Sequence, residues 1–157
     1  MSVGCAEEKL ARSAKIARLP IATVHVHVHL LCDQNNVTWV YANSLTQARA
    51  TPRGRWMKTP PVTTLWRYFV ALHELGHVLM PKQSGKTRLE QEAAAWEWAL
   101  QTCMMEPTPA VWAHVLRCLD SYIGRATRWK SMKIPRSEHV FWTLYNRAAR
   151  QARANEV

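Results

Sequence analysis

Apolar and polar residues alternate most regularly between residues 21 and 31. Within the stretch IATVHVHVHLL, residues 24–30 have valine or leucine at every second position and histidine between them. A period of two puts successive side chains on opposite faces of a strand, so the pattern predicts a β-strand. The turn-forming residues CDQNN follow, and the β-branched and aromatic VTWVYA at 37–42 predicts an antiparallel hairpin partner. RGRWMKT at 53–59 is expected to form a third, irregular strand.

The remaining segments have a helical period. Residues 7–20 predict an amphipathic opening helix that stops at Pro20. In a later segment Glu90 follows Thr87 by three residues, the spacing of a capping box. Each later helix is expected to begin after a residue whose side chain can cap its N-terminus. The predicted helices, with the capping residue in brackets, are 63–81 (Thr63 or Thr64), 87–106 (Thr87), 108–123 (Thr108) and 137–153 (Ser137).

Composition favours a single globular domain. The chain has 157 residues, of which 48% are hydrophobic, and this is enough to bury a substantial core. No apolar run reaches the ~20 residues of a membrane helix, and the N-terminus lacks the order of a signal peptide, so we expect a cytoplasmic protein without membrane contact. The four cysteines are far apart without a CxxC pair and are expected to be reduced thiols.

Positive charge is concentrated in the last third of the chain. Residues 107–157 carry nine Lys or Arg against three acids, whereas residues 21–106 carry eight against six. Basic helices of this kind either form solvated faces or attract nucleic acid, and the sequence leaves both interpretations open.

The segment LHELGHVL at 72–79 lies inside a predicted helix and contains an HExxH motif. His73 and His77 are four residues apart, so their rings share one helix face and can bind one zinc ion. Glu74 lies about 100° around the helix from His73 and can take the proton of a zinc-bound water. We therefore expect Zn²⁺ as the cofactor and Glu74 as the catalytic general base.

A catalytic zinc site needs a third protein ligand. The HExxHxxGxxH pattern is excluded, because Met80 and Gln83 stand where it requires glycine and histidine. No aspartate occurs between Asp33 and Asp120, so an acid on the following helix must be a glutamate. The candidates are Glu90, Glu92 and Glu97.

Neighbouring side chains favour Glu90 modestly over Glu92 as the third ligand. The ligand helix has to approach the motif helix closely, and the small residues Ala93 and Ala94 beside Glu90 permit this approach. Trp96, which shares a face with Glu92, would hold the two backbones apart. Glu92 stays the alternative.

HELGH followed by LEQEAAAWEWAL resembles the ImmA/IrrE-like zinc metallopeptidases, in which a helix of the form E-x-x-A-N-x-(aromatic or Leu)-A follows the motif. More broadly it is similar to thermolysin-like zincins, which use glutamate as the third ligand. The resemblance covers residues 65–100 and implies Glu90 as that ligand. The chain departs from the pattern at Ala94, where the family usually has asparagine, and at Glu97, where it has a small residue. The resemblance further implies limited cleavage of a regulatory protein, with a DNA-bound regulator as one candidate.

Other histidines and tyrosines are secondary candidates. His25, His27 and His29 would share one face of the predicted strand and could hold a metal ion, but the predicted strand at 21–31 contains no acid that could act as a base, which favours an ordinary half-buried strand. A peptidase also needs a group that stabilises the oxyanion. The candidates for that role are His114, Tyr122, His139 and Tyr145.

Together these patterns predict an α+β, zincin-like fold, with a short antiparallel sheet packed on a metal-binding helix and further helices around it. One domain, 1–157, would contain a β region at 21–59, metal-binding helices at 63–106 and a basic helical part at 107–157. The predicted function is zinc-dependent hydrolysis of peptide bonds in a protein or peptide substrate. The alternative is a nucleic-acid-associated or regulatory binding protein with a structural metal, and the presence of Glu74 favours the enzyme.

Overall fold

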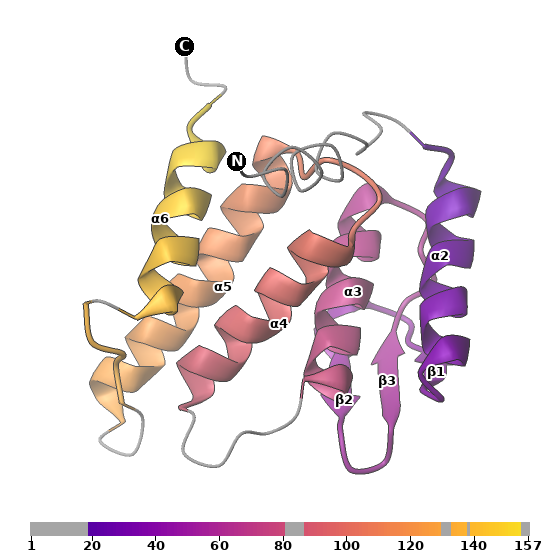
Figure 1. Cartoon of the computed structure of the whole chain (residues 1–157), viewed down its shortest axis with the longest axis horizontal. Coiled ribbons are helices and arrows are strands. Elements are labelled where there is room, and N and C mark those ends of the chain that lie inside the picture. Colours follow the sequence, from indigo (N-terminus) through magenta and orange to yellow (C-terminus); the bar gives the residue numbers. More distant parts are fainter. Residues whose placement is uncertain (1–18, 81–86, 130–132, 138, 155–157) are drawn as a thin grey trace, which may run out of the picture.

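The structure is a computed structural model and describes residues 19–80, 87–129, 133–137 and 139–154. In these ranges it is a mixed α+β fold, in which the helices lie side by side and a small sheet lies at the α2 and α3 end (Figure 1). The predicted opening helix falls outside the described residues up to position 18. No helix in the described ranges has the length and apolar character needed to cross a membrane. The helices are α2 (Ile21–Gln34), α3 (Leu65–Leu79), α4 (Arg88–Thr102), α5 (Pro109–Arg128) and α6 (Val140–Ala152).

The sheet is mixed and not antiparallel as expected. Its strands have the order β1-β3-β2, and β3 pairs parallel with β1 and antiparallel with β2. The strands predicted at 37–42 and 53–59 are confirmed, but β2 was not predicted, because three residues are too few to show a period. The short helix η1 precedes β2. The elements are β1 (Thr38–Tyr41), η1 (Leu45–Gln47), β2 (Arg49–Thr51) and β3 (Trp56–Thr59).

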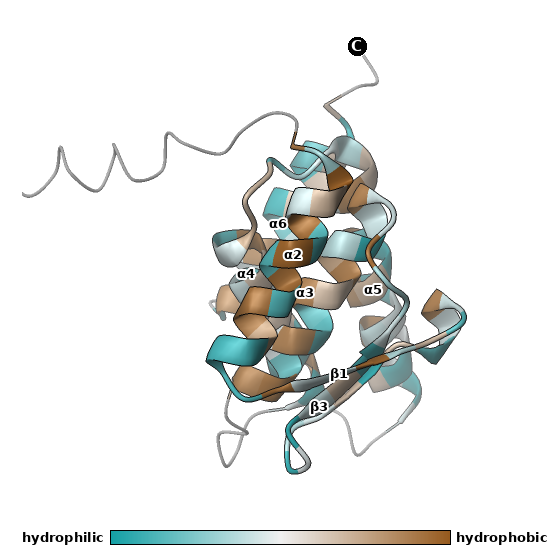
Figure 2. Ribbon diagram, turned by 90° about the vertical axis from the view of Figure 1, so that its right-hand side faces the viewer, coloured by the Kyte–Doolittle hydropathy of each residue, from teal (hydrophilic) through white to brown (hydrophobic). Residues whose placement is uncertain are grey.

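The histidine-rich segment predicted as a strand at 21–31 is helix α2, so this prediction was wrong. Its burial follows a helical period, because Val24 and Val28 lie four residues apart and are both fully buried. Val26 and Leu30 are 52% and 51% exposed, so α2 also has hydrophobic residues on its exposed side, and the ribbon of α2 in Figure 2 has several hydrophobic positions. Residues four apart lie on the same face of both a strand and a helix, so the alternation of valine and histidine did not distinguish a strand from a helix. The predicted β region therefore begins only at β1.

Three of the predicted helix caps are confirmed and one is wrong. The hydroxyls of Thr64, Thr87 and Thr108 accept hydrogen bonds from backbone N–H groups three residues ahead in α3, α4 and α5. Helix α6 was expected to be capped by Ser137, but His139 Nδ1 accepts the hydrogen bond from the Phe141 N–H at 3.0 Å. An imidazole nitrogen can fill the role of a capping oxygen, which the usual Ser/Thr/Asp/Asn preference does not reveal.

Helices α3 and α4 approach each other closely at Gly76. A Cβ atom added there would lie 2.8 Å from the carbonyl oxygen and 3.2 Å from the Cα of Ala95. Both are backbone atoms, so neither can rotate away. The absence of a side chain at Gly76 therefore allows α4 to lie against the turn of α3 that carries the second motif histidine.

Replacing Gly76 with alanine is expected to destabilise the fold by about 1–2 kcal/mol, because overpacking against the Ala95 backbone outweighs the gain in helix propensity. The matched control is Gly124→Ala in α5, where an added Cβ has no atom within 4 Å. The control should stabilise the protein by up to about 1 kcal/mol. Denaturant unfolding measures both changes, and equal stabilisation by the two substitutions would contradict the close contact.

Helices α5 and α6 complete the bundle on the far side of α4. Arg147 of α6 donates hydrogen bonds to both carboxylate oxygens of Glu97 in α4, at 3.0 and 2.9 Å. The described cysteines are free, in agreement with the expected reduced thiols, and Cys32 and Cys103 are buried whereas Cys118 is partly buried.

Candidate metal centre

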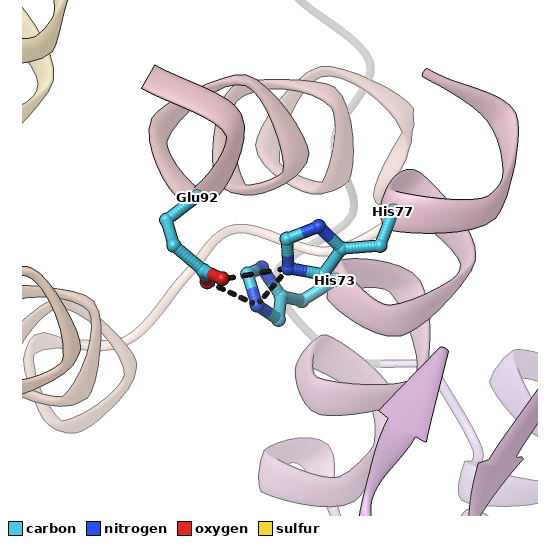
Figure 3. Close-up of side chains that lie close together, drawn as sticks. All are labelled: His73, His77 and Glu92. Carbon is cyan, nitrogen blue, oxygen red and sulfur yellow. Dashed lines mark hydrogen bonds and ion pairs between the residues drawn. The ribbon is translucent and has the colours of Figure 1, made fainter. Parts of the chain in front are cut away.

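Two histidines of α3 and one glutamate of α4 direct their side-chain tips to one point (Figure 3). His73 Nε2 and His77 Nε2 are 3.1 Å apart, and each lies 3.2 Å from Glu92 Oε2. His73 and Glu92 are buried, with exposed fractions of 7% and 2%, and His77 is partly buried. Among the histidine, cysteine and acidic side chains in the described residues, this is the one group that could hold a metal ion.

The spacing of the three atoms fits a tetrahedral metal site. Ligand nitrogens and oxygens that lie about 2.0–2.2 Å from a zinc ion in tetrahedral directions are about 3.3 Å from one another. The separations of 3.1 and 3.2 Å between His73, His77 and Glu92 are close to that value. Two imidazoles and one carboxylate are also a donor set that zinc commonly takes in catalytic sites.

The protonation states favour metal binding. Burial lowers the pKa of His73 to about 4, so its ring is neutral near pH 7. Burial alone would raise the pKa of Glu92, but hydrogen bonds from the two histidines hold it well below its usual range. Arg88 Nη2 lies 3.0 Å from the other carboxylate oxygen of Glu92 and further stabilises its negative charge. Neutral imidazole and ionised carboxylate are the forms that bind metals.

The three candidate metal ligands line a pocket of about 260 Å³, called here the metal pocket. Glu74 lines this pocket too, although its carboxylate is not one of the three converging donors. Burial raises the pKa of Glu74 to about 7, against an opposing effect of His77. A carboxyl group with a pKa near neutrality can both accept and donate a proton in one reaction cycle. The metal pocket is lined by Ala48, Arg49, Ala50, Pro52, His73, Glu74, His77, Met80, Arg88, Gln91, Glu92, Ala94 and Tyr122.

Aromatic side chains fix the orientation of His73. The Trp96 ring stacks on the His73 ring, with a centroid distance of 4.1 Å and an interplanar angle of 23°. His114 of α5 packs edge-on against Trp66 and lies 5.7 Å from Trp96. Trp96 therefore does not separate the helices, as the sequence argument assumed, because it lies flat against the histidine. This packing limits rotation of the His73 ring.

Glu90, the preferred third ligand, does not reach the histidines in this structure. One of its carboxylate oxygens accepts the hydrogen bond from the Thr87 N–H that completes the capping box, and the other lies 3.1 Å from His139 Nε2. The sequence argument placed the close approach of the helices at Ala93 and Ala94, but the close contact in the structure is that of Ala95 with Gly76. Ala95 lies three residues after Glu92, so the closest approach is on the Glu92 side of α4.

A pattern in the sequence could have identified Glu92. The helix form E-x-x-A-N-x-(aromatic or Leu)-A can also be aligned with its first position at Glu92, which places Ala95, Trp98 and Ala99 on its alanine, aromatic and final alanine positions. This register matches the final small residue, which the register starting at Glu90 does not. The departure at the asparagine position then falls on Trp96, the residue that stacks on His73.

In the described part of the chain, Tyr122 lines the metal pocket, and the other three candidates for stabilising the oxyanion do not. His114 is held between aromatic rings and close to Cys118, and burial lowers its pKa to about 4. Tyr145 donates its hydroxyl hydrogen to Asp120 at 2.7 Å, and His139 caps α6.

The histidines of α2 form hydrogen bonds within the fold. His25 Nδ1 accepts a hydrogen bond from the Val62 N–H at 3.2 Å, so the proton of the neutral ring resides on Nε2, which faces the Tyr41 hydroxyl at 3.4 Å. The same hydroxyl lies 2.8 Å from His29 Nε2. On the other side, His27 Nδ1 lies 2.8 Å from the Tyr68 hydroxyl. These ring nitrogens have partners within the fold, and no histidine of α2 belongs to the group of described side chains that could hold a metal ion, which favours a structural role for them.

Comparison of the chain with protein families, curated proteins and solved structures found no match in any of the three. The resemblance to ImmA/IrrE-like peptidases stays a prediction. The function is therefore inferred from the geometry of the site.

Proposed function

We propose that the protein is a zincin-like, zinc-dependent metallopeptidase that hydrolyses peptide bonds in a protein substrate. His73, His77 and Glu92 would hold the zinc ion, and Glu74 would be the general base. The observation that carries the proposal is the convergence of these three donors in the wall of a pocket that Glu74 also lines.

The number of ligands and the open pocket favour catalysis over a structural metal. Structural zinc sites usually have four protein ligands, whereas catalytic sites have three and leave one position for water or substrate. The described residues supply three donors, and the space beside them is a pocket of about 260 Å³. A structural site would have no use for Glu74, a carboxyl group at the same pocket, and this argues against the alternative of a nucleic-acid-associated protein with a structural metal.

The residues around the pocket can perform the proton transfers of peptide hydrolysis. A bound zinc ion supplies Lewis acidity, which polarises the substrate carbonyl and makes water more acidic. The Glu74 carboxylate takes a proton from the attacking water as the new carbon–oxygen bond forms. The same carboxyl group then gives that proton to the amide nitrogen as the carbon–nitrogen bond breaks. Its pKa of about 7 suits both transfers.

Tyr122 is suited to stabilise the oxyanion. Its side chain lines the metal pocket, and burial raises the pKa of its hydroxyl, which keeps its proton at neutral pH. Arg88 Nη2 donates a hydrogen bond to the Tyr122 oxygen at 3.4 Å, and a hydrogen bond to Glu92 also helps to raise the pKa of the hydroxyl, so the Tyr122 hydroxyl lies beside the proposed zinc ligand Glu92. A hydroxyl donor directed at developing negative charge lowers the barrier of acyl transfer.

Strand β2 supports a peptide as the substrate. It lies at an edge of the sheet, and Arg49 and Ala50 of β2 line the metal pocket. An edge strand has backbone groups that can pair with an extended peptide, and such pairing binds many sequences through the main chain. An extended substrate along β2 would bring one of its peptide bonds beside the metal-binding residues.

Zinc is expected to stabilise the folded protein and to support hydrolysis. Free zinc at about 100 times its Kd should raise the free energy of unfolding by about 2.7 kcal/mol. A zinc chelator should abolish hydrolysis of denatured casein, and added zinc should restore it. Metal content, thermal unfolding and peptide release measure these effects. Mg²⁺ is the matched control ion, because it prefers octahedral oxygen ligands and should neither stabilise the protein nor restore hydrolysis.

A protein that binds one equivalent of zinc and releases no peptides from casein or from a mixed-sequence peptide library would contradict the proposed peptidase. Salt-sensitive binding of nucleic acid by the same zinc-loaded protein would instead favour the alternative.

A further inference from the structure

A second pocket adjoins the metal pocket and is lined largely by arginine, and it is called here the arginine pocket. It has a volume of about 380 Å³. Arg88 and Tyr122 line both pockets, so the two share a wall. The other lining residues are Arg125 and Arg128 from the last turn of α5, and Trp129 directly after it.

The arginine pocket carries unbalanced positive charge. No aspartate or glutamate is among its lining residues. The charge of Arg88 is balanced by Glu92, 3.0 Å away. Arg125 and Arg128 form no ion pair within the described part of the chain. The pocket can therefore accept a negative charge from a ligand.

The Tyr122 ring holds two of the guanidinium groups of the arginine pocket in position. Arg88 and Arg125 both lie over the Tyr122 ring, at 5.6 and 5.1 Å from its centre. Trp129 is 61% exposed and offers a further aromatic wall. A guanidinium group stacked on a ring keeps its N–H edge available, and that edge matches the two oxygens of a carboxylate.

The helix dipole alone does not account for this arrangement. Basic residues in the last turn of a helix complement its negative end, and Arg150 has the same place in α6. Neither Arg150 nor Arg153 lines the metal pocket or the arginine pocket. The α5 arginines differ because they surround a hollow beside the metal pocket, together with Tyr122.

We propose that the arginine pocket binds an acidic side chain of the substrate, next to the peptide bond that is cleaved. This inference rests on the proposed peptidase function. Arg88 and Tyr122 line both pockets, so the two pockets are adjacent. When a substrate peptide bond lies in the metal pocket, a residue close to that bond would therefore lie at the arginine pocket. Within the arginine pocket the unbalanced charge is confined to Arg125 and Arg128, which matches a single acidic side chain. A continuous polyanion such as nucleic acid would instead extend past the Glu74 carboxyl group of the metal pocket.

The test measures binding to the zinc-loaded Glu74→Gln protein, which should hold a peptide without cleaving it. The probes are pairs of fluorescent peptides that differ only by Glu or Gln at one position. The varied position is one of the three residues before or the three residues after the central peptide bond. At one position the Glu peptide should bind about tenfold more tightly than its Gln partner, as expected for a charge-assisted contact in a partly exposed pocket. Adding Arg125→Gln and Arg128→Gln should reduce this ratio to about one. The matched control, Arg150→Gln with Arg153→Gln, removes the same charge and should keep the tenfold ratio.

Equal affinity for Glu and Gln at every position, or no measurable binding of any peptide, would overturn the acidic subsite. So would loss of the ratio in the control, because overall charge would then explain the preference. Weaker binding of duplex DNA after the Arg125 and Arg128 substitutions, with an unchanged Glu to Gln ratio, would also overturn it. If wild type hydrolyses no peptide while the ratio behaves as expected, the peptidase function fails and the subsite stands.

Discussion

Replacing Glu74 with glutamine is expected to lower peptide hydrolysis about 1,000-fold while zinc stays bound. Glutamine has nearly the same shape but cannot take up a proton from water, and positioned general bases contribute about 100- to 10,000-fold to a rate. The three metal-binding atoms belong to other residues, so zinc affinity should change little. The measurement is kcat for a cleaved peptide together with metal content. Glu106→Gln, which changes an exposed carboxylate, is the matched control and should keep full activity.

The same substitution has an expected effect on the stability of the metal-free protein. Because burial raises the pKa of Glu74 to about 7, ionisation is easier in the unfolded chain, and wild type loses stability as the pH rises from about 4.5 to about 7. Glu74→Gln lacks this loss, so it should be more stable than wild type at pH 8 and should have no such advantage at pH 4. Unfolding at both pH values tests this. Full activity with bound zinc in Glu74→Gln would show that another group acts as the base.

Replacing Glu92 with glutamine is expected to weaken zinc binding at least about 100-fold. Residues that only hydrogen-bond to a metal ligand lower the metal affinity by up to about 100-fold when they are replaced, and loss of a ligand itself should cost at least as much. Glu92 Oε2 lies 3.2 Å from both histidine nitrogens, and a neutral amide is a poorer zinc ligand than a carboxylate. Competition with a chromophoric chelator measures the affinity, and circular dichroism shows whether the variant is folded.

Glu90→Ala is the matched control for Glu92→Gln. Its carboxylate closes the capping box of α4 and lies 3.1 Å from His139, so its loss should cost about 1 kcal/mol of stability. Zinc affinity should stay within a few-fold of wild type. The opposite result, in which Glu90→Ala loses zinc and Glu92→Gln keeps it, would return the ligand role to Glu90. Glu92→Ala gives a second measurement, since it leaves no side-chain oxygen.

The choice between Glu90 and Glu92 shows where local patterns conflict. The capping-box spacing of Thr87 and Glu90 was predicted correctly, and it directs the Glu90 carboxylate back to the first turn of α4. The same carboxylate was also expected to bind the metal, which this capping role does not allow. The two predictions were incompatible, and the capping prediction had the stronger local physical basis. Tertiary packing then brought Glu92 to the histidines through the contact of Gly76 with Ala95.

Helix α2 shows a second limit of local patterns. Valines at every second position satisfy a strand and also supply the spacing of four that a helix buries. The histidines between them obtain partners from distant parts of the chain, with Tyr41 on β1 and Tyr68 on α3. Contacts of this kind are absent from the local sequence, so they could not enter the prediction.

The sequence by itself determined the N-terminal ends of α3, α4 and α5 and the position of His73 and His77 on one helix face, whereas α5 continues to Arg128 and does not end at residue 123 as expected. These features depend on groups within a few residues of one another, such as a capping hydroxyl and the N–H three positions ahead. Tertiary structure decided the helical state of α2, the mixed sheet and the position of Glu92 at the two histidines. Those features depend on which surfaces of separate elements pack together, and packing energy there outweighs the small differences in local preference.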